Sequence, residues 1–402
     1  MTSSLPVAPA FPFARECPYH PPELYKRARA EQPVFPVTLW NGQRAWLITK
    51  YEDVKAVITD PRFSGRFSRP DFPAVTEARV AIDKAERAFV GMDNPEHGRY
   101  RRMFTPEFSS KHMLELRPRI EAIARDLVDG VIAKGPPTDL VEALAVPFPA
   151  LVMCALFGTA YEDHQFIMEC AAARHGMTLS ASTATGKARA LVDYMRRLID
   201  HKEANPVDDM VSRIIRDHVL PGKLSREDFA EIGAMILRGG FDTTVNMIGT
   251  GTLLLLQNRA LFEQLRADPA LMPGAVEELL RFVSPVQYAP RRVALEDVEF
   301  GGALIRKGDG IFPLLQAANR DERVFANPDE LDFGRADANQ QLAFGFGIHQ
   351  CLGQMLARME LQIMFGLIVE RLPGLRLAVP VEEIRFKSDM QIYGIYNLPV
   401  SW

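Results

Sequence analysis

The chain has 402 residues, of which 47% are hydrophobic and 24% charged, and its formal net charge is -4. These values are typical of a soluble globular protein with a substantial core, and the small net charge gives no electrostatic reason to expect nucleic acid or an anionic membrane as a partner. The four cysteines are scattered and form no C-x-x-C pair, which disfavours a disulfide framework and a structural zinc site and fits a reducing cytoplasm.

The N-terminal part of the chain predicts a surface segment followed by a hairpin. Residues 1–22 are proline-rich and contain no basic stretch followed by an apolar run, so we expect no signal peptide and a segment that packs on the protein. No run of about 18 apolar residues occurs anywhere, which predicts no spanning helix. Asn41-Gly42 separates two strand-like runs in "FPVTLW-NG-QRAWLITK", the pattern of a β-hairpin.

Helical periodicity dominates from about residue 51 to 290. One predicted helix is unusually long, because Ser225 is a plausible N-cap and the pattern continues to about Leu256. Gly239 and Gly240 lie in the middle of this helix, where each glycine costs about 1 kcal/mol relative to alanine. We therefore expect that something requires the missing side chains.

Two segments have weak periodicity and are predicted to be mobile, residues 65–87 and the small-residue stretch 176–186. Strand-like runs return after Pro290 and in the tail at 392–402. The expected fold is mainly α with a minor β region, in a single domain over residues 1–402.

The stretch "AFGFGIHQCLGQMLAR", residues 343–358, places Cys351 in a glycine-punctuated loop just before a helical pattern. A thiolate at a helix start is stabilised by the helix dipole and by free backbone N–H groups. The glycines permit positive φ angles and a close approach of the backbone to a flat ligand, and the phenylalanines of the loop can exclude water. These are the requirements of a thiolate bound to iron, although a buried structural cysteine is the ordinary alternative.

The run F-G-x-G-x-H-x-C-x-G is similar to the cysteine loop of the cytochrome P-450 family, and further landmarks follow in the family's order along nearly the whole chain. The resemblance implies a triangular prism of helices, with haem b between the long central helix and the cysteine loop. It implies that Cys351 is the axial iron ligand and that His349 hydrogen-bonds a haem propionate. The other loop residues expected beside the haem are Phe344, Gly345 and Gly353.

Three further motifs carry the resemblance. Glu278 and Arg281 in "EELLRF" match the family's E-x-x-R pair, which is structural and supports haem retention. His97 and Arg101 in "NPEHGRYRR" are spaced i, i+4 on one helix face and match the H-x-x-x-R pair that anchors the propionates. Arg292 matches a further propionate-binding arginine, with the neighbouring Arg291 as the alternative.

The run "GGFDTT", residues 239–244, resembles the family's oxygen-activation motif. In that reading Gly239 and Gly240 leave a groove for dioxygen, and Asp242 and Thr243 deliver protons to it. A mere helix kink with a hydroxyl that hydrogen-bonds the backbone is the alternative.

Arg238 stands where the family usually has an aliphatic residue beside the substrate pocket. A buried arginine is costly unless it is paired, so it either binds an acidic or carbonyl-bearing substrate or forms an internal salt bridge. Segments 65–87 and 174–186 are expected to line the pocket, as are these residues from elsewhere in the chain: Met235, Arg238, Val286, Ala289 and Ile392.

The implied function is a cytoplasmic, bacterial-type haem-thiolate monooxygenase of secondary metabolism. It would oxidise a small, largely hydrophobic molecule with O2 and two electrons that come ultimately from NAD(P)H. A separate ferredoxin or flavodoxin with its reductase would deliver them near Arg102 and Arg358, and the chain would be a monomer without nucleic-acid or membrane partners. The alternatives are a nitric oxide reductase using NAD(P)H directly, a peroxygenase and a non-enzymatic haem sensor. The Asp242-Thr243 pair disfavours all three.

Overall fold

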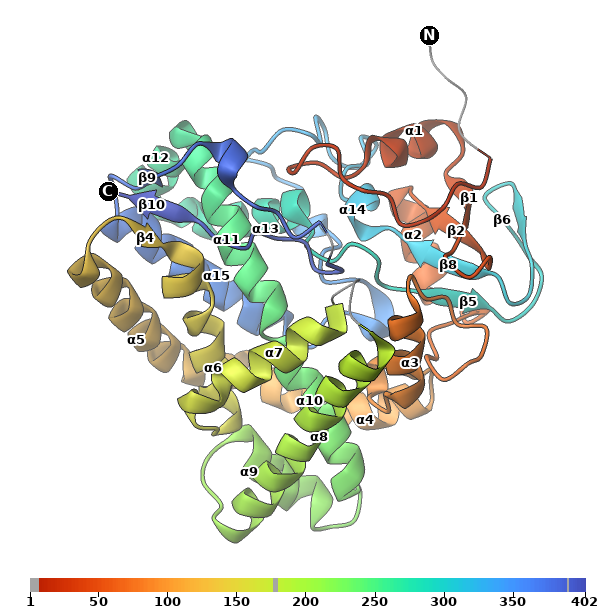
Figure 1. The fold of residues 1–402 in the computed structure, drawn as a ribbon, viewed down its shortest axis with the longest axis horizontal. Coiled ribbons are helices and arrows are strands. Elements are labelled where there is room, and N and C mark those ends of the chain that lie inside the picture. Colours follow the sequence, from red (N-terminus) through yellow and green to blue (C-terminus); the bar gives the residue numbers. More distant parts are fainter. Residues whose placement is uncertain (1–6, 176–179, 389) are drawn as a thin grey trace. The chain divides into compact units, whose positions relative to one another are not determined.

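The computed structural model describes residues 7–175, 180–388 and 390–402 (Figure 1). The chain divides into two compact units: unit 1 is Met1–Gly98, Met177–Thr185 and Glu277–Cys351, and unit 2 is Arg99–Gly176, Gly186–Val276 and Leu352–Trp402. Whether the units form the expected single domain over 1–402 stays a prediction. Among the described residues, no helix is both long enough and apolar enough to cross a membrane.

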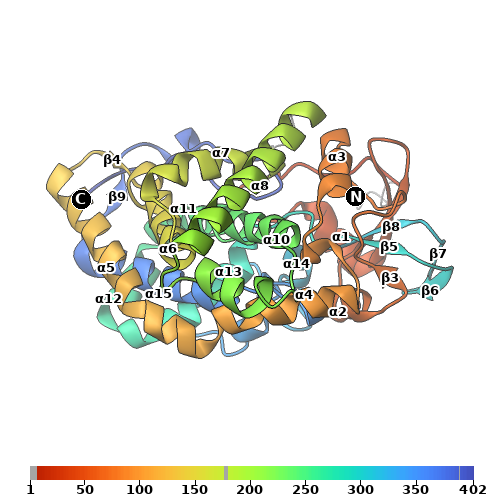
Figure 2. The same cartoon turned by 90° about the horizontal axis from the view of Figure 1, so that it is seen from below.

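Unit 1 is built around a five-stranded sheet with the order β1-β2-β8-β5-β3. Figure 2 shows β8, β5 and β3 in this succession. All five strands are short. They are β1 Val34–Thr38, β2 Arg44–Ile48, β3 Phe63–Ser64, β5 Arg292–Ala294 and β8 Gly310–Pro313. The helices of this unit are α1 Glu23–Glu31, α2 Tyr51–Thr59, α3 Glu77–Ala85, α14 Leu315–Ala318 and most of α13 Met272–Val283.

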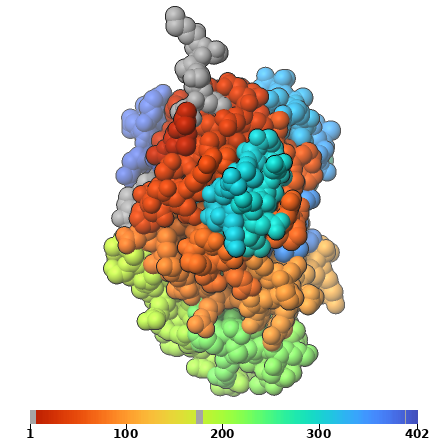
Figure 3. Space-filling model, turned by 90° about the vertical axis from the view of Figure 1, so that its right-hand side faces the viewer, coloured from red at the N-terminus to blue at the C-terminus, as the bar shows by residue number. Residues whose placement is uncertain are grey.

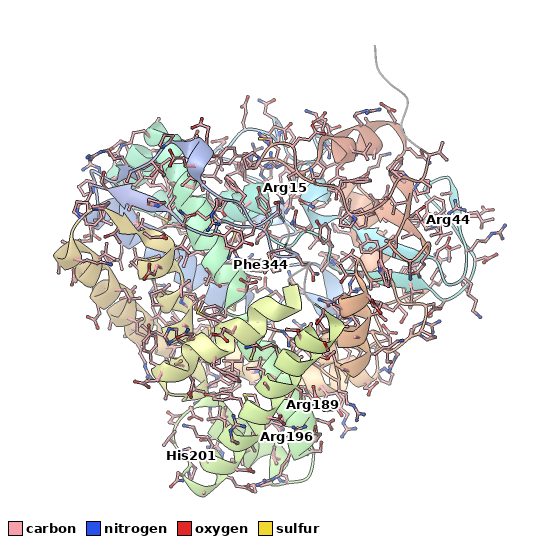
Figure 4. All side chains as sticks on the ribbon, in the orientation of Figure 1. Arg15, Arg44, Arg189, Arg196, His201 and Phe344 are labelled. Atoms are coloured by element: carbon pink, nitrogen blue, oxygen red, sulfur yellow. The ribbon has the colours of Figure 1, made fainter. Side chains whose placement is uncertain are left out.

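The predicted N-terminal hairpin is confirmed. β1 and β2 pair antiparallel with Val34 opposite Ile48 and Thr38 opposite Arg44. Gly42 has φ of +81°, the left-handed conformation that a tight turn requires and that glycine adopts without strain. Before the hairpin, Arg15 donates hydrogen bonds to the side chains of Gln287 at 3.2 Å and Gln316 at 2.8 Å, which attaches the N-terminal segment to unit 1 (Figure 4).

A hydrophobic cluster beneath the sheet also holds a second hairpin, β6 Val298–Phe300 and β7 Ala303–Ile305. Val298 and Ile305 are opposite each other in this hairpin, and both are buried in one cluster with Val34 and Trp46. In the space-filling view of Figure 3 the hairpin is the cyan patch that lies on the N-terminal residues, coloured red to orange. Distant parts of the sequence therefore share this core.

The two segments predicted to be mobile contain helices. Within 65–87, α3 begins after Thr76, whose side chain accepts a hydrogen bond from the Arg79 N–H at 3.2 Å, a typical N-cap. α8 Ala181–Ala204 starts inside the stretch expected to be a linker, so that expectation is wrong from Ala181 onward. Small residues such as alanine favour helices as readily as linkers. Residues 176–179 lie outside the described residues.

Unit 2 is mainly helical. The helical periodicity predicted from about residue 51 to 290 appears here first as α5 Ser110–Lys134. The unit's other helices are α6 Pro147–Phe157, α7 His164–His175, most of α8, α9 Met210–Ile214, α10 Arg226–Gly239, α11 Asp242–Gln257, α12 Arg259–Ala267 and α15 Gln354–Arg371, while α4 Glu96–Phe104 spans the boundary between the units. A small sheet has the order β4-β10-β9, from β4 Thr138–Asp139, β10 Pro399–Ser401 and β9 Arg376–Leu377.

The long helix expected from Ser225 to about Leu256 is interrupted. Ser225 is an N-cap as predicted, since its hydroxyl accepts from the Asp228 N–H at 3.0 Å. However, α10 ends at Gly239 and α11 begins at Asp242. A Cβ on Gly240 would lie 2.5 Å from the sulfur of Met153, so a side chain here would require the end of that methionine in α6 to move. The low helix propensity of Gly239 and Gly240 explains why the pattern does not continue as one helix.

Candidate functional site

The loop before Cys351 has the backbone that its glycines predict. Gly345 and Gly347 have φ of +73° and +69°. The Cys351 N–H donates to the Phe344 carbonyl at 2.8 Å and closes the loop three residues before α15 begins (Figure 4). Gly353, by contrast, has an ordinary φ of -86°.

Cys351 differs from two other cysteines in its surroundings. Its side chain is exposed, whereas Cys154 and Cys170 are buried and their thiol pKa values are raised by that burial. A raised pKa keeps a thiol protonated, and a protonated thiol is a poor metal ligand. Cys351 is therefore better suited than these two to bind a metal as a thiolate.

Phe346 attaches the Cys351 loop to the core of unit 1. Its ring packs against the core cluster of unit 1, and the Lys55 ammonium lies over it at 5.0 Å from the ring centroid. A Cβ on Gly347 would lie 3.0 Å from a methyl carbon of Thr59 in α2. The loop thus rests on α2, which fixes its position within unit 1.

Cationic and hydrogen-bonding side chains gather around Gly65 in unit 1. The rings of His97 and His349 have centroids 4.2 Å apart, and His97 is buried. A Cβ on Gly65 would lie 3.3 Å from an Arg292 nitrogen and 3.5 Å from His349 Nε2. The absence of a side chain at this position keeps the space between Arg292 and His349 open. The name "Gly65 cradle" is used below for His97, Arg292 and His349 with Gly65.

Arg292 is the strongest electrostatic feature of the Gly65 cradle. It is 5% exposed and donates only to the carbonyls of Arg291 at 2.9 Å and Ile58 at 3.4 Å. Burial lowers its pKa to about 10, and Asp93 partly offsets this effect. Within the described residues no carboxylate forms an ion pair with it. A buried guanidinium in this state favours an anionic ligand.

Arg291, the other candidate, is already paired. Its guanidinium donates to Asp83 in α3 at 2.7 and 3.1 Å and to the Pro73 carbonyl at 2.8 Å. Successive side chains of an extended chain point to opposite sides, so the two neighbouring arginines serve different places. The geometry favours Arg292 over Arg291 as an anion-binding residue.

Glu278 and Arg281 form a fully buried pair at the end of α13. Arg281 donates to both carboxylate oxygens, at 2.6 and 2.7 Å, and both side chains are 0% exposed. Glu278 also accepts from Arg335 at 3.1 Å and from the Asp332 N–H at 3.0 Å. The remaining donors of Arg281 bind the carbonyls of Asn319, Pro328 and Glu330. The pair thus fixes the segment that precedes the Cys351 loop.

The predicted oxygen-activation motif lies at the break between α10 and α11. Asp242 is buried, which raises the pKa of its carboxyl group, while Lys387 and Asn246 oppose this shift. Asn246 donates to Asp242 Oδ1 at 3.0 Å, and within the described residues Asp242 Oδ2 has no hydrogen-bond partner. Thr243 donates to the Gly239 carbonyl at 3.1 Å. The raised pKa favours the neutral, protonated form of this carboxyl group.

Sequence reasoning missed Glu360, which lies in α15. It is 1% exposed, burial raises its pKa to about 8, and a hydrogen bond to Thr244 opposes this shift. Thr244 in turn donates to the Gly240 carbonyl at 3.4 Å. The signal in the sequence was a single carboxylate within the apolar run "MELQIMFGLIV".

The expected substrate-pocket residues divide between the units. Arg238 and Ile392 are buried in unit 2 and Met235 is half-buried there, while Val286 and Ala289 are half-buried in unit 1. Arg101 lies on α4 one turn after His97 and is half-buried. A small cavity with room for about one water molecule lies beside the helix break. It is lined by Ala150, Met153, Cys154, His164, Ile167, Leu237 and Phe241.

No cluster of three or more histidine, cysteine, aspartate or glutamate side chains in the described part of the chain could hold a metal ion. An iron held by a porphyrin and a single protein thiolate requires no such cluster. Unit 1 therefore contains an exposed thiol and the Gly65 cradle, and unit 2 contains a buried acid beside the helix break.

Comparisons with known proteins agree with this geometry. A family model for cytochrome P450 matches residues 182–375. Cytochrome P450-SU2 of Streptomyces griseolus is 44% identical over 391 residues, which cover 96% of this chain and 94% of that protein. Pentalenic acid synthase of Streptomyces avermitilis is 43% identical over 400 residues, covering 99% and 98%. The crystal structure of MycCI from Micromonospora griseorubida, a mycinamicin VIII C21 methyl hydroxylase, matches with a TM-score of 0.92 and 34% identity, covering 98% of this chain and 100% of that one.

A mainly helical fold of this kind, with identities at this level over the whole chain, defines a haem-thiolate oxidoreductase. The chain belongs to the cytochrome P450 family, and it is a monooxygenase of that family. Membership implies haem, O2 and a source of reducing equivalents. The relatives from Streptomyces fit the predicted place in secondary metabolism.

Proposed function

We propose that Cys351 is the axial ligand of a haem b whose propionates are bound by the Gly65 cradle, with Arg101 as a further donor. The observation that carries this proposal is the buried Arg292, which has no carboxylate partner among the described residues and lies beside His349. A propionate would supply the anionic partner that the geometry favours for Arg292. The exposed thiol of Cys351 and the left-handed glycines before it fit a close approach to a flat cofactor. We assign Phe344, Gly345 and Gly353 to the same surroundings.

When bound, the haem supplies the activation of O2 by one-electron steps. The chain's own residues hold and move the protons that this chemistry consumes. Asp242 holds a proton at its Oδ2, since burial favours the neutral acid, and Thr243 carries a hydroxyl one residue later that passes it on. Gly239 and Gly240 keep side chains away from this place. Glu278 and Arg281 hold the segment before the Cys351 loop and take no part in the chemistry.

The substrate we propose is a small, largely hydrophobic organic molecule that receives one oxygen atom. Met235, Val286, Ala289 and Ile392 supply apolar contacts, and Arg238 would bind an acidic or carbonyl group or a structural acid. The two relatives described above are named for different molecules, pentalenic acid and mycinamicin VIII, so neither name selects the substrate of this chain.

The electrons reach the chain from NAD(P)H through a separate ferredoxin or flavodoxin and its reductase. Arg102 is exposed and Arg358 is half-buried, and we assign both to the docking of this acidic partner in the cytoplasm. We propose that the chain acts as a monomer.

The test compares Cys351→Ser with Cys17→Ser in protein purified from haem-replete cells. The wild type and the Cys17→Ser control should carry haem, and their reduced forms should show the strongly red-shifted carbon monoxide band of thiolate ligation. Cys351→Ser should lose that band. A red-shifted band that survives in Cys351→Ser would refute the assignment.

The same preparations separate the monooxygenase from the nitric oxide reductase alternative. Purified chain mixed with NADH and nitric oxide, without a partner protein, should oxidise NADH no faster than protein-free buffer. Rapid oxidation under these conditions would favour the reductase.

A further inference from the structure

Arg291 and Asp83 join two parts of unit 1 that are far apart in the sequence. Arg291 directly precedes β5, and Asp83 lies in α3. The two side chains share two hydrogen bonds, of 2.7 and 3.1 Å, and are 3% and 4% exposed. The same carboxylate accepts from Arg79 at 2.8 Å. A single buried carboxylate therefore holds two guanidinium groups.

Aromatic rings complete this cluster. The Arg291 guanidinium lies 5.3 Å from the Phe67 ring centroid and 5.0 Å from that of Phe72, and the two rings are 5.1 Å apart. Arginine on an aromatic face gains cation–π energy, which increases when water is excluded. The stretch before α3 is thus attached to Arg291 as well, and its Pro73 carbonyl accepts from the same side chain at 2.8 Å.

An adjacent face of α3 makes an apolar contact. Ala78 and Ile82 pack with Ala184, and Ala181 lies against them, at the first turns of α8. α3 and this end of α8 can be followed side by side in Figures 1 and 2. The contact consists mostly of alanine methyl groups, which bury little area, so it is weak by itself.

We propose that Arg291 and Asp83 form a latch that fixes α3 against β5, and that this latch determines which substrates the protein accepts. The proposal rests on the proposed function in one respect, because it needs the substrate pocket proposed there and takes residues 65–87, as the sequence predicts, to line it. With the latch closed, α3 supports the first turns of α8. Without it, α3 loses the paired guanidinium of Arg291, and the helix becomes more mobile. Arg291 and Asp83 are positioning residues in this proposal and touch no substrate.

The adjacent residues Arg291 and Arg292 therefore have different roles. Arg292 belongs to the Gly65 cradle, whereas Arg291 holds α3. Substitution of either residue by glutamine should therefore give a different phenotype. Arg292→Gln should lower haem content, and Arg291→Gln should leave it unchanged.

The experiment measures hydrogen exchange of α3 amides by mass spectrometry, with haem content measured on the same samples. Arg291→Gln keeps the Asp83–Arg79 pair within α3 and should fold, while exchange over residues 78–85 should rise about tenfold. Arg69→Gln is the matched control. Arg69 pairs with Asp71, and both residues of this pair precede α3 in the same segment. It should leave α3 exchange unchanged. Unchanged exchange in Arg291→Gln would overturn the latch.

Selectivity is measured with two ligands of haem iron that differ in size, imidazole and 4-phenylimidazole. Arg291→Gln should weaken binding of the larger ligand by about tenfold, which is about 1.4 kcal/mol, and change imidazole by less than about twofold. Asp83→Asn should act in the same direction, and Arg291→Lys should be intermediate because it retains the charge without the two-pronged geometry. Faster exchange with unchanged affinity for both ligands would overturn the role in selectivity. Haem loss in Arg291→Gln with retention in Arg292→Gln would instead refute the cradle assignment in the proposed function.

Discussion

Two buried glutamates, Glu278 in unit 1 and Glu360 in unit 2, are almost equally hidden from water but have opposite surroundings. Glu278 accepts hydrogen bonds from two arginines and a backbone N–H. Glu360 has a threonine hydroxyl, and its Oε1 has no partner among the described residues. Burial alone therefore does not determine whether a buried carboxyl group is ionised. The hydrogen-bond donors around the group decide whether it is held as a carboxylate or is able to hold a proton.

The largest effect is expected from removing the charge partner of Glu278. Arg281→Met deletes the two N–H donors of this arginine to the carboxylate and its bonds to three backbone carbonyls, and we expect the free energy of unfolding to fall by about 3–5 kcal/mol. Urea unfolding followed by circular dichroism measures it. The control is Arg306→Met, whose solvent-exposed pair with Asp297 should contribute little to the free energy of unfolding. Equal losses in the two variants would show that Glu278 is not held as a fixed charge.

The sequence could predict local features of unit 1 and unit 2, but it could not predict the environment of Glu360. The left-handed glycines at 345 and 347, the Asn41-Gly42 turn and the Ser225 cap depend on a few neighbouring residues, and each appeared where the pattern placed it. The E-x-x-R pair was found because its motif is local as well.

Tertiary packing decided the features that the sequence did not reveal. The packing at the helix break involves Met153, about ninety residues before Gly240, whose side chain lies where a Cβ on Gly240 would be. Glu360 is buried because α15 packs against α11, where a Cβ on Gly251 would lie 2.5 Å from the ring of Phe365. The helical pattern of α15 alone cannot show which of its polar residues is buried. The pairing of Arg291 with Asp83 likewise joins residues more than two hundred positions apart.

The next effect, visible only as a function of pH, is expected from Glu360→Gln. The native pKa of about 8 lies above the ordinary 4.5, so the folded state binds more protons than the unfolded state between these values. Stability should therefore fall as pH rises through this range, by up to about 1.4 kcal/mol per pH unit. Glutamine resembles the neutral acid and should remove this slope, so the variant should be about as stable as the wild type near pH 5 and more stable at pH 8.

Unfolding free energies measured from pH 5 to 8.5 test the contrast between the two glutamates. Glu370→Gln, an exposed position on the same helix, should retain the wild-type slope. A wild-type slope that persists in Glu360→Gln would mean that Glu360 is ionised in the native state, like a paired carboxylate.

The smallest effect is expected from Thr244→Val, which removes the hydroxyl that hydrogen-bonds Glu360. This bond lowers the pKa of Glu360 and also opposes the cost of its burial. Without it the pKa should rise further, and the pH range over which stability falls should extend upward. At pH 6, where the acid is neutral, the loss should be about 1 kcal/mol, the contribution of one ordinary hydrogen bond. Thr244→Ser keeps the hydroxyl and should preserve the wild-type pH profile. A wild-type profile in Thr244→Val would show that the hydroxyl does not set the environment of Glu360, and the donor-based distinction between the two glutamates would fail at this residue.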